Sequence, residues 1–287
     1  MNALYATLIL LPIVIGVYAY IGYPMLLRLF APAQHAQPGF PTGAEWPLIT
    51  LTVPCYNEER NIRQTLEALL ALDYPAERRQ ILVISDASSD GTDNIVREFA
   101  DRGVEILRLD TRRGKSAAEN AAGAVARGAI VFNTDATIRI LPDALKALVS
   151  AFSDPLVGVA SGRDVSVSAA GAQPGSGETS GESGYVGYEM DIRALEKRVG
   201  SIVGASGCFY GIRKSLYDSA FPESLSRDFA SALIAREAGF RAVSVNAAVC
   251  LVPRTQSLQS EYRRKIRTMA RGLQTLWYKR HLLNPTR

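Results

Sequence analysis

Residues 81–92 read Ile-Leu-Val-Ile-Ser-Asp-Ala-Ser-Ser-Asp-Gly-Thr, an apolar and largely β-branched run that ends abruptly in acidic and hydroxyl side chains. The same change occurs where residues 48–53 lead into Asn-Glu-Glu at 57–59, and where residues 130–132 lead into Asn-Thr-Asp-Ala-Thr. Segments of helical period alternate with these runs, which predicts an α/β fold with a mostly parallel, doubly wound sheet. Ligands of such sheets bind at the carboxyl ends of the strands, so we expect several carboxylates at one crevice rim. Carboxylates crowded there require a cation or hydrogen-bond donors among them.

The bulk composition bounds the class of protein. The chain has 287 residues, 47% of them apolar and 21% charged, which is typical of a globular core with some membrane contact. The three cysteines, Cys55, Cys208 and Cys250, have no metal-ligand spacing, and His35 and His281 lie far from them in the sequence. This argues against a zinc site and a disulfide framework, and favours a reducing compartment.

The N-terminal segment predicts a membrane anchor. Residues 1–27 carry no charged side chain, and Arg28 ends the stretch. About 20 apolar residues span a bilayer, so we expect one transmembrane helix at residues 1–28, followed by a linker at residues 29–47. A secretory signal is disfavoured because no basic residue precedes the run and the run is too long. A buried core helix is the alternative.

The flanks of this segment indicate its orientation. Tyr18, Tyr20 and Tyr23 suit the aromatic belt of a membrane interface, and Arg28 begins the basic part of the chain. We therefore expect an inner or plasma membrane protein with a single N-terminal span and a cytoplasmic catalytic domain. That domain covers residues 48–255, and its halves are 48–152 and 153–255.

The C-terminal region, residues 256–287, predicts an amphipathic helix. Between Glu261 and His281 there are seven basic residues and one acid, a net of +6, whereas the whole chain carries +4. Such a helix can lie in a membrane interface and bind anionic lipid, although an ordinary solvated helix face is the alternative. Nucleic acid is not expected, because the net positive charge is concentrated in this region and a stacking surface of aromatic rings is missing. Apolar residues at helical spacing are Ile266, Met269, Ala270, Leu273, Leu276 and Trp277.

A basic cluster precedes an alanine-rich segment at residues 116–126. The sequence Gly-Lys-Ser at 114–116 is no P-loop, because Leu109 stands where that motif needs its first glycine. Arg112, Arg113 and Lys115 would lie at a helix N-terminus, where the helix dipole favours phosphate. A solvated charge cluster is the alternative. The chain also lacks a Gly-x-Gly-x-x-Gly motif after a strand, which disfavours a dinucleotide dehydrogenase.

Three aspartates are candidates for chemistry. Asp135 follows a predicted strand and is a natural ligand for Mg²⁺ or Mn²⁺, although an aspartate there could also start a turn. Asp86 follows a strand in the same way, and Asp228 either serves a site or merely caps a late helix. Their order along the chain favours a shared site.

From residue 49 to residue 272 the chain resembles family 2 glycosyltransferases, because its motifs occur in the family's order with familiar gaps. The resemblance implies a GT-A fold, a nucleotide-sugar donor and inversion at the transferred sugar. It also makes residues 48–152 the nucleotide-sugar-binding half and residues 153–255 the acceptor half. The matching stretches are residues 53–58, 85–92, 113–115 with Asn120, 135–137, 204–207 and 227–229.

The resemblance assigns the donor side. Asp86 would hold the nucleobase, and Pro54, Tyr56 and Glu58 would line the nucleoside site. Arg113 and Lys115 would lie near the ribose or the diphosphate, and a UDP-sugar is the expected donor.

The resemblance also assigns the reacting groups. Asp135 would bind Mg²⁺ or Mn²⁺ at the diphosphate, Asp228 would be the base, and Gly207 and Arg227 would lie on the acceptor side. A cation and Lys115 can stabilise the charge on a departing diphosphate, and a carboxylate can take a proton from an attacking hydroxyl. We expect a glycan or lipid-linked acceptor in the synthesis of a cell-surface or exported glycan, with partner membrane subunits possible.

Departures from the family pattern leave an alternative open. Thr137 stands where the metal motif usually has a second acid, and Arg227 precedes the base where an acid is usual. Residues 259–263, Gln-Ser-Glu-Tyr-Arg, differ from the Gln-x-x-Arg-Trp of processive synthases. The alternative is therefore a catalytically degenerate module that binds nucleotide and scaffolds a partner synthase. A nucleotidyltransferase is disfavoured because residues 57–59 are acidic rather than basic and glycine-rich.

Overall fold

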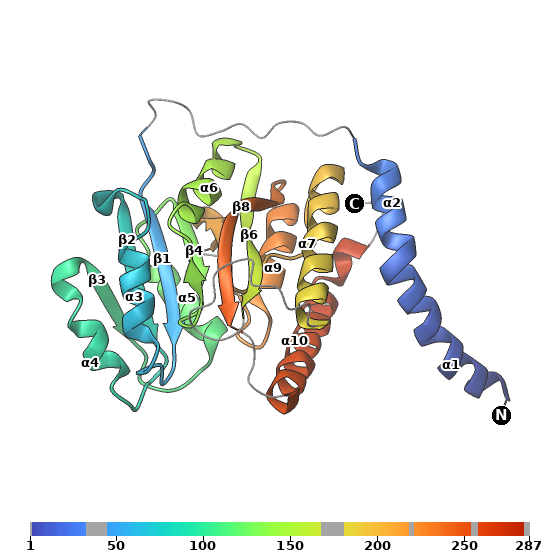
Figure 1. Ribbon diagram of the computed structural model, residues 1–287, viewed down its shortest axis with the longest axis horizontal. Coiled ribbons are helices and arrows are strands. Elements are labelled where there is room, and N and C mark those ends of the chain that lie inside the picture. The colour runs from blue at the N-terminus through green and yellow to red at the C-terminus, as the bar shows by residue number, and fades with distance from the viewer. Residues whose placement is uncertain (1, 33–44, 168–180, 218–220, 254–257, 284–287) are drawn as a thin grey trace.

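The computed structural model describes residues 2–32, 45–167, 181–217, 221–253 and 258–283. Its centre is an eight-stranded sheet covered by helices on both faces (Figure 1). In sheet order the strands are β3 (Val104–Arg108), β2 (Arg79–Ser85), β1 (Ile49–Cys55), β4 (Ile130–Thr134), β7 (Phe209–Arg213), β6 (Val157–Val167), β8 (Arg241–Pro253) and β5 (Arg139–Ile140).

The sheet is mostly parallel, as the sequence predicts. Strands β3, β2, β1 and β4 run parallel, and their register places Cys55 beside Ser85 at the carboxyl ends of β1 and β2. Strand β7 is antiparallel to both β4 and β6, β6 is parallel to β8, and the short β5 is antiparallel to β8. The helices are α1 (Asn2–Val17), α2 (Tyr23–Phe30), α3 (Ile62–Leu70), α4 (Thr92–Arg97), α5 (Lys115–Val125), α6 (Ala144–Ser150), α7 (Gly181–Val199), α8 (Lys214–Tyr217), α9 (Arg227–Glu237) and α10 (Leu258–Tyr278).

The central strands are buried on both faces, which explains their uninterrupted apolar runs. On one face Leu51 and Val83 belong to the large core cluster that also includes residues of α3 and α6. On the other face Leu82 and Ile84 pack against Ala118 and the neighbouring turn of α5. The small side chains of α5 let its backbone approach the sheet closely, so the start of this helix is held firmly at the sheet's rim.

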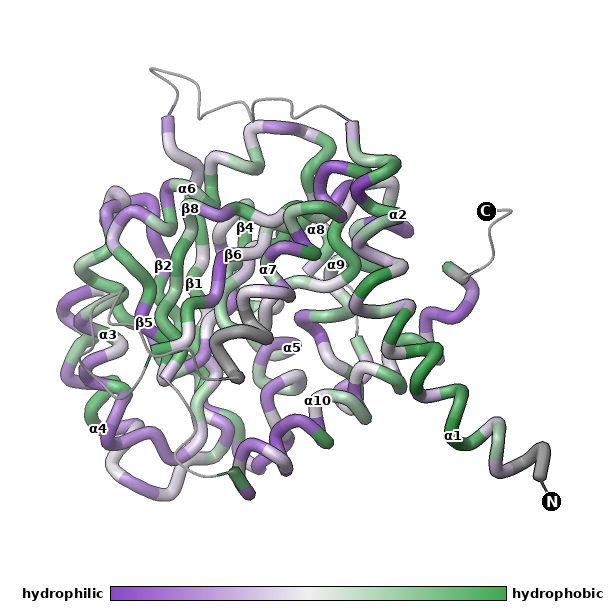
Figure 2. The backbone as a smooth tube through the Cα atoms, turned by 45° about the vertical axis from the view of Figure 1, so that its right-hand side comes forward, coloured by the Kyte–Doolittle hydropathy of each residue, from purple (hydrophilic) through white to green (hydrophobic). Residues whose placement is uncertain are grey.

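The N-terminal segment is one long apolar helix. Helix α1, a π-helical turn at Tyr18–Gly22 and α2 follow one another without a break. Tyr5–Phe30 is long and apolar enough to cross a membrane by length and composition, and none of its most apolar window is buried within the protein (Figure 2). The helix is therefore confirmed over residues 2–30, burial of its most apolar window in a core is excluded, and its passage through a membrane stays a prediction.

Several predicted boundaries were wrong. The apolar runs at residues 157–160 and 165–167 each predict a short strand, but both belong to the single strand β6, and the run at residues 242–245 is part of the 13-residue β8. Residues 168–184 are mostly Gly, Ser and Ala, which predicts a loop, but residues 181–184 belong to α7, and residues 168–180 lie outside the described residues. Most of the predicted linker, residues 33–44, also lies outside them.

Candidate active site

Asp86 lies at the carboxyl end of β2 and organises the loop that leads into α5. Its carboxylate is 4% exposed and accepts hydrogen bonds from the backbone N–H groups of Arg113 at 2.8 Å and Gly114 at 2.7 Å. Gly114 has φ +94°, a left-handed conformation that favours glycine. The carboxylate of Asp86 therefore fixes the position from which Lys115, the first residue of α5, extends.

The carboxyl end of β1 borders the same loop. Pro54 and Tyr56 are half-buried, and the guanidinium of Arg112 lies 3.8 Å from the centre of the Tyr56 ring. Glu58 receives a hydrogen bond from the Asn61 side chain at 2.8 Å, and its own backbone N–H donates to the hydroxyl of Thr92, the first residue of α4. The residues expected to line a nucleoside site thus lie at one rim, next to Asp86.

Lys115 joins several parts of the site. Its Nζ donates to Asp135 Oδ1 at 2.6 Å and to the backbone oxygen of Gly207 at 3.0 Å, and Glu119 Oε1 lies 4.0 Å away. Burial opposes the charge on this ammonium, but Asp135, Glu119 and Asp228 outweigh it and raise the pKa of Lys115 above its usual value. Asp135 itself is 40% exposed at the end of β4, as expected for a residue that meets a ligand.

Asp228 lies on the other side of Gly207. It stands in the first turn of α9, and its Oδ1 accepts hydrogen bonds from the Ser226 hydroxyl and from the backbone N–H of Phe229 at 2.8 Å. A Cβ added to Gly207 would be 2.3 Å from Asp228 Oδ2, so this carboxylate lies directly against the glycine. The structure therefore brings Asp228 and the Lys115–Asp135 pair together across Gly207, although they are far apart in the sequence.

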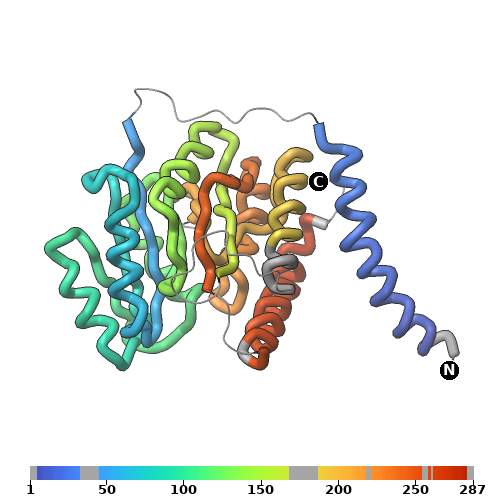
Figure 3. Tube along the Cα trace, viewed as in Figure 1, coloured from blue at the N-terminus to red at the C-terminus, as the bar shows by residue number. Residues whose placement is uncertain are grey.

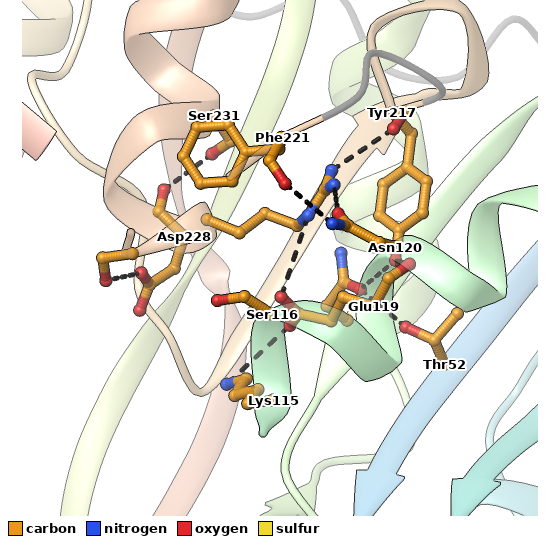
Figure 4. Close-up of polar contacts among 12 residues, drawn as sticks. Thr52, Lys115, Ser116, Glu119, Asn120, Tyr217, Phe221, Asp228 and Ser231 are labelled. Atoms are coloured by element: carbon orange, nitrogen blue, oxygen red, sulfur yellow. Dashed lines mark hydrogen bonds and ion pairs between the residues drawn. The ribbon is translucent and has the colours of Figure 1, made fainter. Parts of the chain in front are cut away.

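Behind Lys115 lies a buried polar cluster that sequence reasoning missed (Figure 4). Glu119 is 1% exposed, and its Oε1 has no hydrogen-bond partner among the described residues. Burial raises the pKa of Glu119 to about 7, although Lys115 and Arg227 oppose this effect. No sequence pattern could have identified it, because a glutamate in an alanine-rich helix usually faces solvent.

Arg227 belongs to this buried cluster rather than to the exposed rim. It is 3% exposed, its guanidinium donates to Asn120 Oδ1 and to the backbone oxygen of Tyr217, and its Nε lies 4.0 Å from Glu119 Oε2. It also lies over the rings of Tyr217 and Phe221. Because the Arg227 side chain is buried, it does not reach an acceptor at the exposed rim, although the resemblance implied that it would. Its effect on the neighbouring Asp228 is limited to the position of the backbone and to the charge of the guanidinium.

A second missed pair holds the segment at 204–207. The Ser206 hydroxyl is buried and lies 2.6 Å from both carboxylate oxygens of Asp164, on β6. The backbone N–H of Ser206 donates to the Ser161 hydroxyl at 2.8 Å. These contacts fix the backbone of Gly207, against which both Lys115 and Asp228 rest. The two residues are 42 positions apart, so no local pattern in the sequence indicates the pairing.

The donor set for a metal ion is small. Among the described residues there is no group of three or more His, Cys, Asp or Glu side chains that could hold an ion. Asp135 supplies one carboxylate beside the exposed Thr137. Such a set fits Mg²⁺ or Mn²⁺ in the usual mode of enzymes that bind phosphate esters, with one carboxylate and the remaining oxygens from the substrate and water. The site therefore fits a cation that binds together with a diphosphate.

Comparisons with known proteins identify the family. The family model described as Glycosyl transferase family 2 matches residues 50–221. A probable glycosyltransferase of Bacillus subtilis, YdaM, is 39% identical over 97 residues, which cover 32% of this chain and 23% of YdaM. A poly-beta-1,6-N-acetyl-D-glucosamine synthase of Staphylococcus epidermidis is 33% identical over 116 residues, 40% of this chain and 28% of that protein. The chain thus spans about a quarter of the length of these curated relatives.

A solved structure matches over nearly the whole chain. The mannosyltransferase PcManGT from Pyrobaculum calidifontis, in complex with GDP-Man and Mn2+, superposes with a TM-score of 0.74 at 25% identity and covers 91% of this chain and 73% of that one. This likeness confirms the GT-A fold that the sequence predicts.

Proposed function

The chain belongs to glycosyltransferase family 2 and has the GT-A fold, and from this premise we propose that it is an inverting glycosyltransferase that uses a nucleoside-diphosphate sugar. The observation that supports this most directly is the position of Gly207, with the Lys115–Asp135 pair on one side and the Asp228 carboxylate on the other. A donor phosphate and an acceptor hydroxyl can meet there on opposite sides of the transferred sugar.

The donor binds at the ends of β1 and β2. Pro54, Tyr56, Glu58 and Asp86 line the nucleoside site, and Arg113 with Lys115 lies next to the diphosphate. The fixed N-terminus of α5 favours anions through its free N–H groups and its dipole. We propose a UDP-sugar, and the GDP-Man complex of the archaeal neighbour makes GDP the second nucleotide to test.

Asp135 would hold Mg²⁺ or Mn²⁺ when the donor is bound. A bound divalent cation neutralises the charge that develops on the leaving group. Lys115 supplies a second positive charge next to the diphosphate, and its raised pKa keeps it protonated at neutral pH.

The transfer is a single displacement. The acceptor oxygen forms a bond to the anomeric carbon while the bond from that carbon to the diphosphate oxygen breaks, and the hydroxyl proton passes to Asp228. The nucleoside diphosphate leaves, and the configuration at the anomeric carbon is inverted because attack and departure occur on opposite faces.

We also assign the membrane-facing side. Tyr5–Phe30 spans the bilayer, and α10 lies in the interface on the cytoplasmic side. One stripe of α10 is apolar and exposed by between 50% and 88%, and basic residues flank it, as in helices that bind anionic lipid surfaces. A glycan or lipid-linked acceptor is therefore the expected substrate class. The stripe consists of Leu258, Tyr262, Ile266, Met269, Leu273 and Trp277.

A donor screen tests the proposal. The full chain in detergent or proteoliposomes should release UDP or GDP from one nucleotide sugar in the presence of Mn²⁺. Asp135→Ala and Asp228→Asn should each lose turnover, whereas Asp73→Asn, at an exposed position that precedes β2, should keep it. Retained turnover in both site variants would remove this mechanism.

A nucleotide-binding module that scaffolds a partner synthase is the second candidate. The metal motif favours it, because Asp135 offers a single carboxylate, Thr137 is exposed, and Lys115 already neutralises Asp135. Calorimetric binding of UDP with Mn²⁺, without turnover on any donor, would support this candidate.

A further inference from the structure

Glu119 is a buried carboxylate to which the proposed mechanism assigns no role. It is almost fully buried, yet its Oε1 has no hydrogen bond among the described residues, and its nearest cations lie 4.0 Å away rather than in contact. A buried carboxylate without a close partner is costly, so folded proteins rarely keep one without a use for it. The free oxygen points to a partner that reaches it in another state of the site.

Among the described residues, Lys115 is the cation best placed to become that partner. It lies one turn before Glu119 on the same face of α5, and its Nζ is 4.0 Å from Glu119 Oε1 (Figure 4). A lysine ammonium sits on a flexible four-carbon stem and has three donors, so it can turn from one acceptor to another without any change in the backbone. Arg227 is less able to do this, because its guanidinium is held by Asn120, Tyr217 and two aromatic rings.

Under the proposed function, on which this inference rests, the divalent cation competes with Lys115 for Asp135. In the structure the ammonium is 2.6 Å from Asp135 Oδ1, the carboxylate assigned to the divalent cation. Two cations on the same carboxylate repel each other strongly in a partly buried site. Binding of a diphosphate with its cation therefore favours any arrangement in which Lys115 has left Asp135.

We propose that Lys115 has two positions, on Asp135 before the donor binds and on Glu119 Oε1 when a nucleoside diphosphate and its divalent cation occupy the site. Glu119 is a positioning residue: it receives the ammonium that Asp135 releases and keeps it next to the diphosphate. The Gly207 oxygen, at 3.0 Å, can accept from Lys115 in both positions, which leaves one N–H for a phosphate oxygen. The exchange replaces one hydrogen bond of Lys115 by another, and no covalent bond is made or broken.

Nucleotide affinity with and without metal tests the exchange. Calorimetry would measure the affinity of the full chain in detergent for UDP and then for GDP, each with and without MnCl₂. In the wild type Mn²⁺ should strengthen binding, and Glu119→Gln should reduce this strengthening by about tenfold or more, because a charge-assisted hydrogen bond is lost in the loaded state. Glu119→Asp, which keeps the charge on a shorter stem, should retain part of the strengthening.

The same Glu119 substitution in a Lys115→Met background distinguishes a positioning role of Glu119 from a structural one. In Lys115→Met there is no ammonium to receive, so adding Glu119→Gln should change the Mn²⁺ effect by less than about twofold. Glu196→Gln, which removes another buried helical carboxylate outside the site, is the matched control and should behave like the wild type. An equal loss in both Lys115 backgrounds, or an unchanged Mn²⁺ effect in Glu119→Gln, would overturn the inference.

A structure with UDP and Mn²⁺ gives the direct answer and does not depend on any variant. Lys115 Nζ is expected within hydrogen-bond distance of Glu119 Oε1, and Asp135 should face the metal. A metal-loaded site in which Lys115 remains on Asp135 would refute the exchange and leave the transferase proposal intact. If the wild type binds neither UDP nor GDP, the proposed function fails, and this inference fails with it.

Discussion

Gly207 shows how a single residue can fix the distance between two reacting groups. A Cβ at this position would be 2.3 Å from Asp228 Oδ2, so any side chain must displace the proposed base. We expect Gly207→Ala to lower kcat by about 100-fold or more, since a misplacement of about 1 Å can have that effect, while the melting temperature changes little. Steady-state transfer assays measure this. Gly200→Ala is the control, because a Cβ there meets nothing within 4 Å, and equal activity of the two variants would contradict the prediction.

Glu119 should make stability depend on pH. Its pKa is raised from 4.5 to about 7 by burial, so between these values the folded protein holds a proton that the unfolded chain has lost. This contribution is fully present below about pH 4.5 and disappears as the pH rises through 7, with an upper limit of about 3 kcal/mol.

Glu119→Gln removes that titration, so its melting temperature should fall less than that of the wild type between pH 5 and pH 7.5. Thermal melts of the detergent-solubilised chain measure the difference, and Glu67→Gln, at an exposed position of α3, is the control. Parallel pH profiles for wild type and Glu119→Gln would show that Glu119 does not titrate in this range.

At the scale of elements, α5 connects both halves of the site. Lys115, Ser116, Glu119 and Asn120 lie on one face of the helix, as their i, i+1, i+4 and i+5 spacing requires. Ser116 donates to the backbone oxygen of Leu225 at 2.8 Å, and Asn120 holds the same segment one turn further along. The segment that carries Asp228 is therefore positioned by the helix that carries Lys115.

The sequence predicted this helix and its anion-binding start, but not its second function. Alanine content and the preceding basic residues are local features and could be read directly. The partners of Ser116 and Asn120 are 109 and 101 residues away, so their contacts arise only when the sheet brings the two segments together. The Asp164–Ser206 pair and the buried environment of Arg227 were missed for the same reason.

The strands predicted for the regions of β6 and β8 are shorter than the observed strands, for a different reason. The pairing of β6 with β8 shifts register between Ser161 and Arg163, and β6 is fully buried before the shift but partly exposed after it. Hydrophobic periodicity changes at such a bulge, so one bent strand looks like two. The parallel strands β1, β2 and β4 are buried along almost their whole length, and their continuous apolar runs made them predictable.

Helix α10 gives a direct test of contact with the membrane. The chain has two tryptophans, Trp46 and Trp277, and Trp277 is 71% exposed on the apolar stripe of α10. In a Trp46→Phe background, reconstituted into bilayers with brominated acyl chains, we expect the Trp277 fluorescence to be strongly quenched, and more so in anionic than in neutral bilayers. Bilayers without bromine are the control. Fluorescence that bromine leaves unchanged would place α10 in water or against protein.

For the whole molecule, the two ends of the sheet have different neighbours. Helices α3 and α4 lie at the end of the sheet formed by β3, β2 and β1, where we propose that the nucleotide binds. Helices α7 and α10 and the long N-terminal helix lie at the other end (Figure 3). The N-terminal helix is held to α7, because Tyr188 donates to the backbone oxygen of Ala19 and Tyr23 donates to Glu196. Thr275 of α10 accepts a hydrogen bond from the backbone of Ser226, whose hydroxyl contacts Asp228. The proposed base therefore lies on the side of the molecule that, in our proposal, faces the bilayer, which suits an acceptor that arrives from the membrane.

The charge at the end of the apolar segment predicts which side of the membrane this machinery occupies. Arg28, the first basic residue, lies at this end, and basic residues close to the end of a span remain on the cytoplasmic side during insertion. In a bacterial host, trypsin should therefore digest the catalytic domain in inverted inner-membrane vesicles and leave it intact in spheroplasts, where an externally exposed membrane protein is cleaved as the control. Detergent should make the domain accessible in both preparations. Cleavage in intact spheroplasts would reverse the topology, and the donor would then have to be available outside the cytoplasm, where nucleotide sugars are not made.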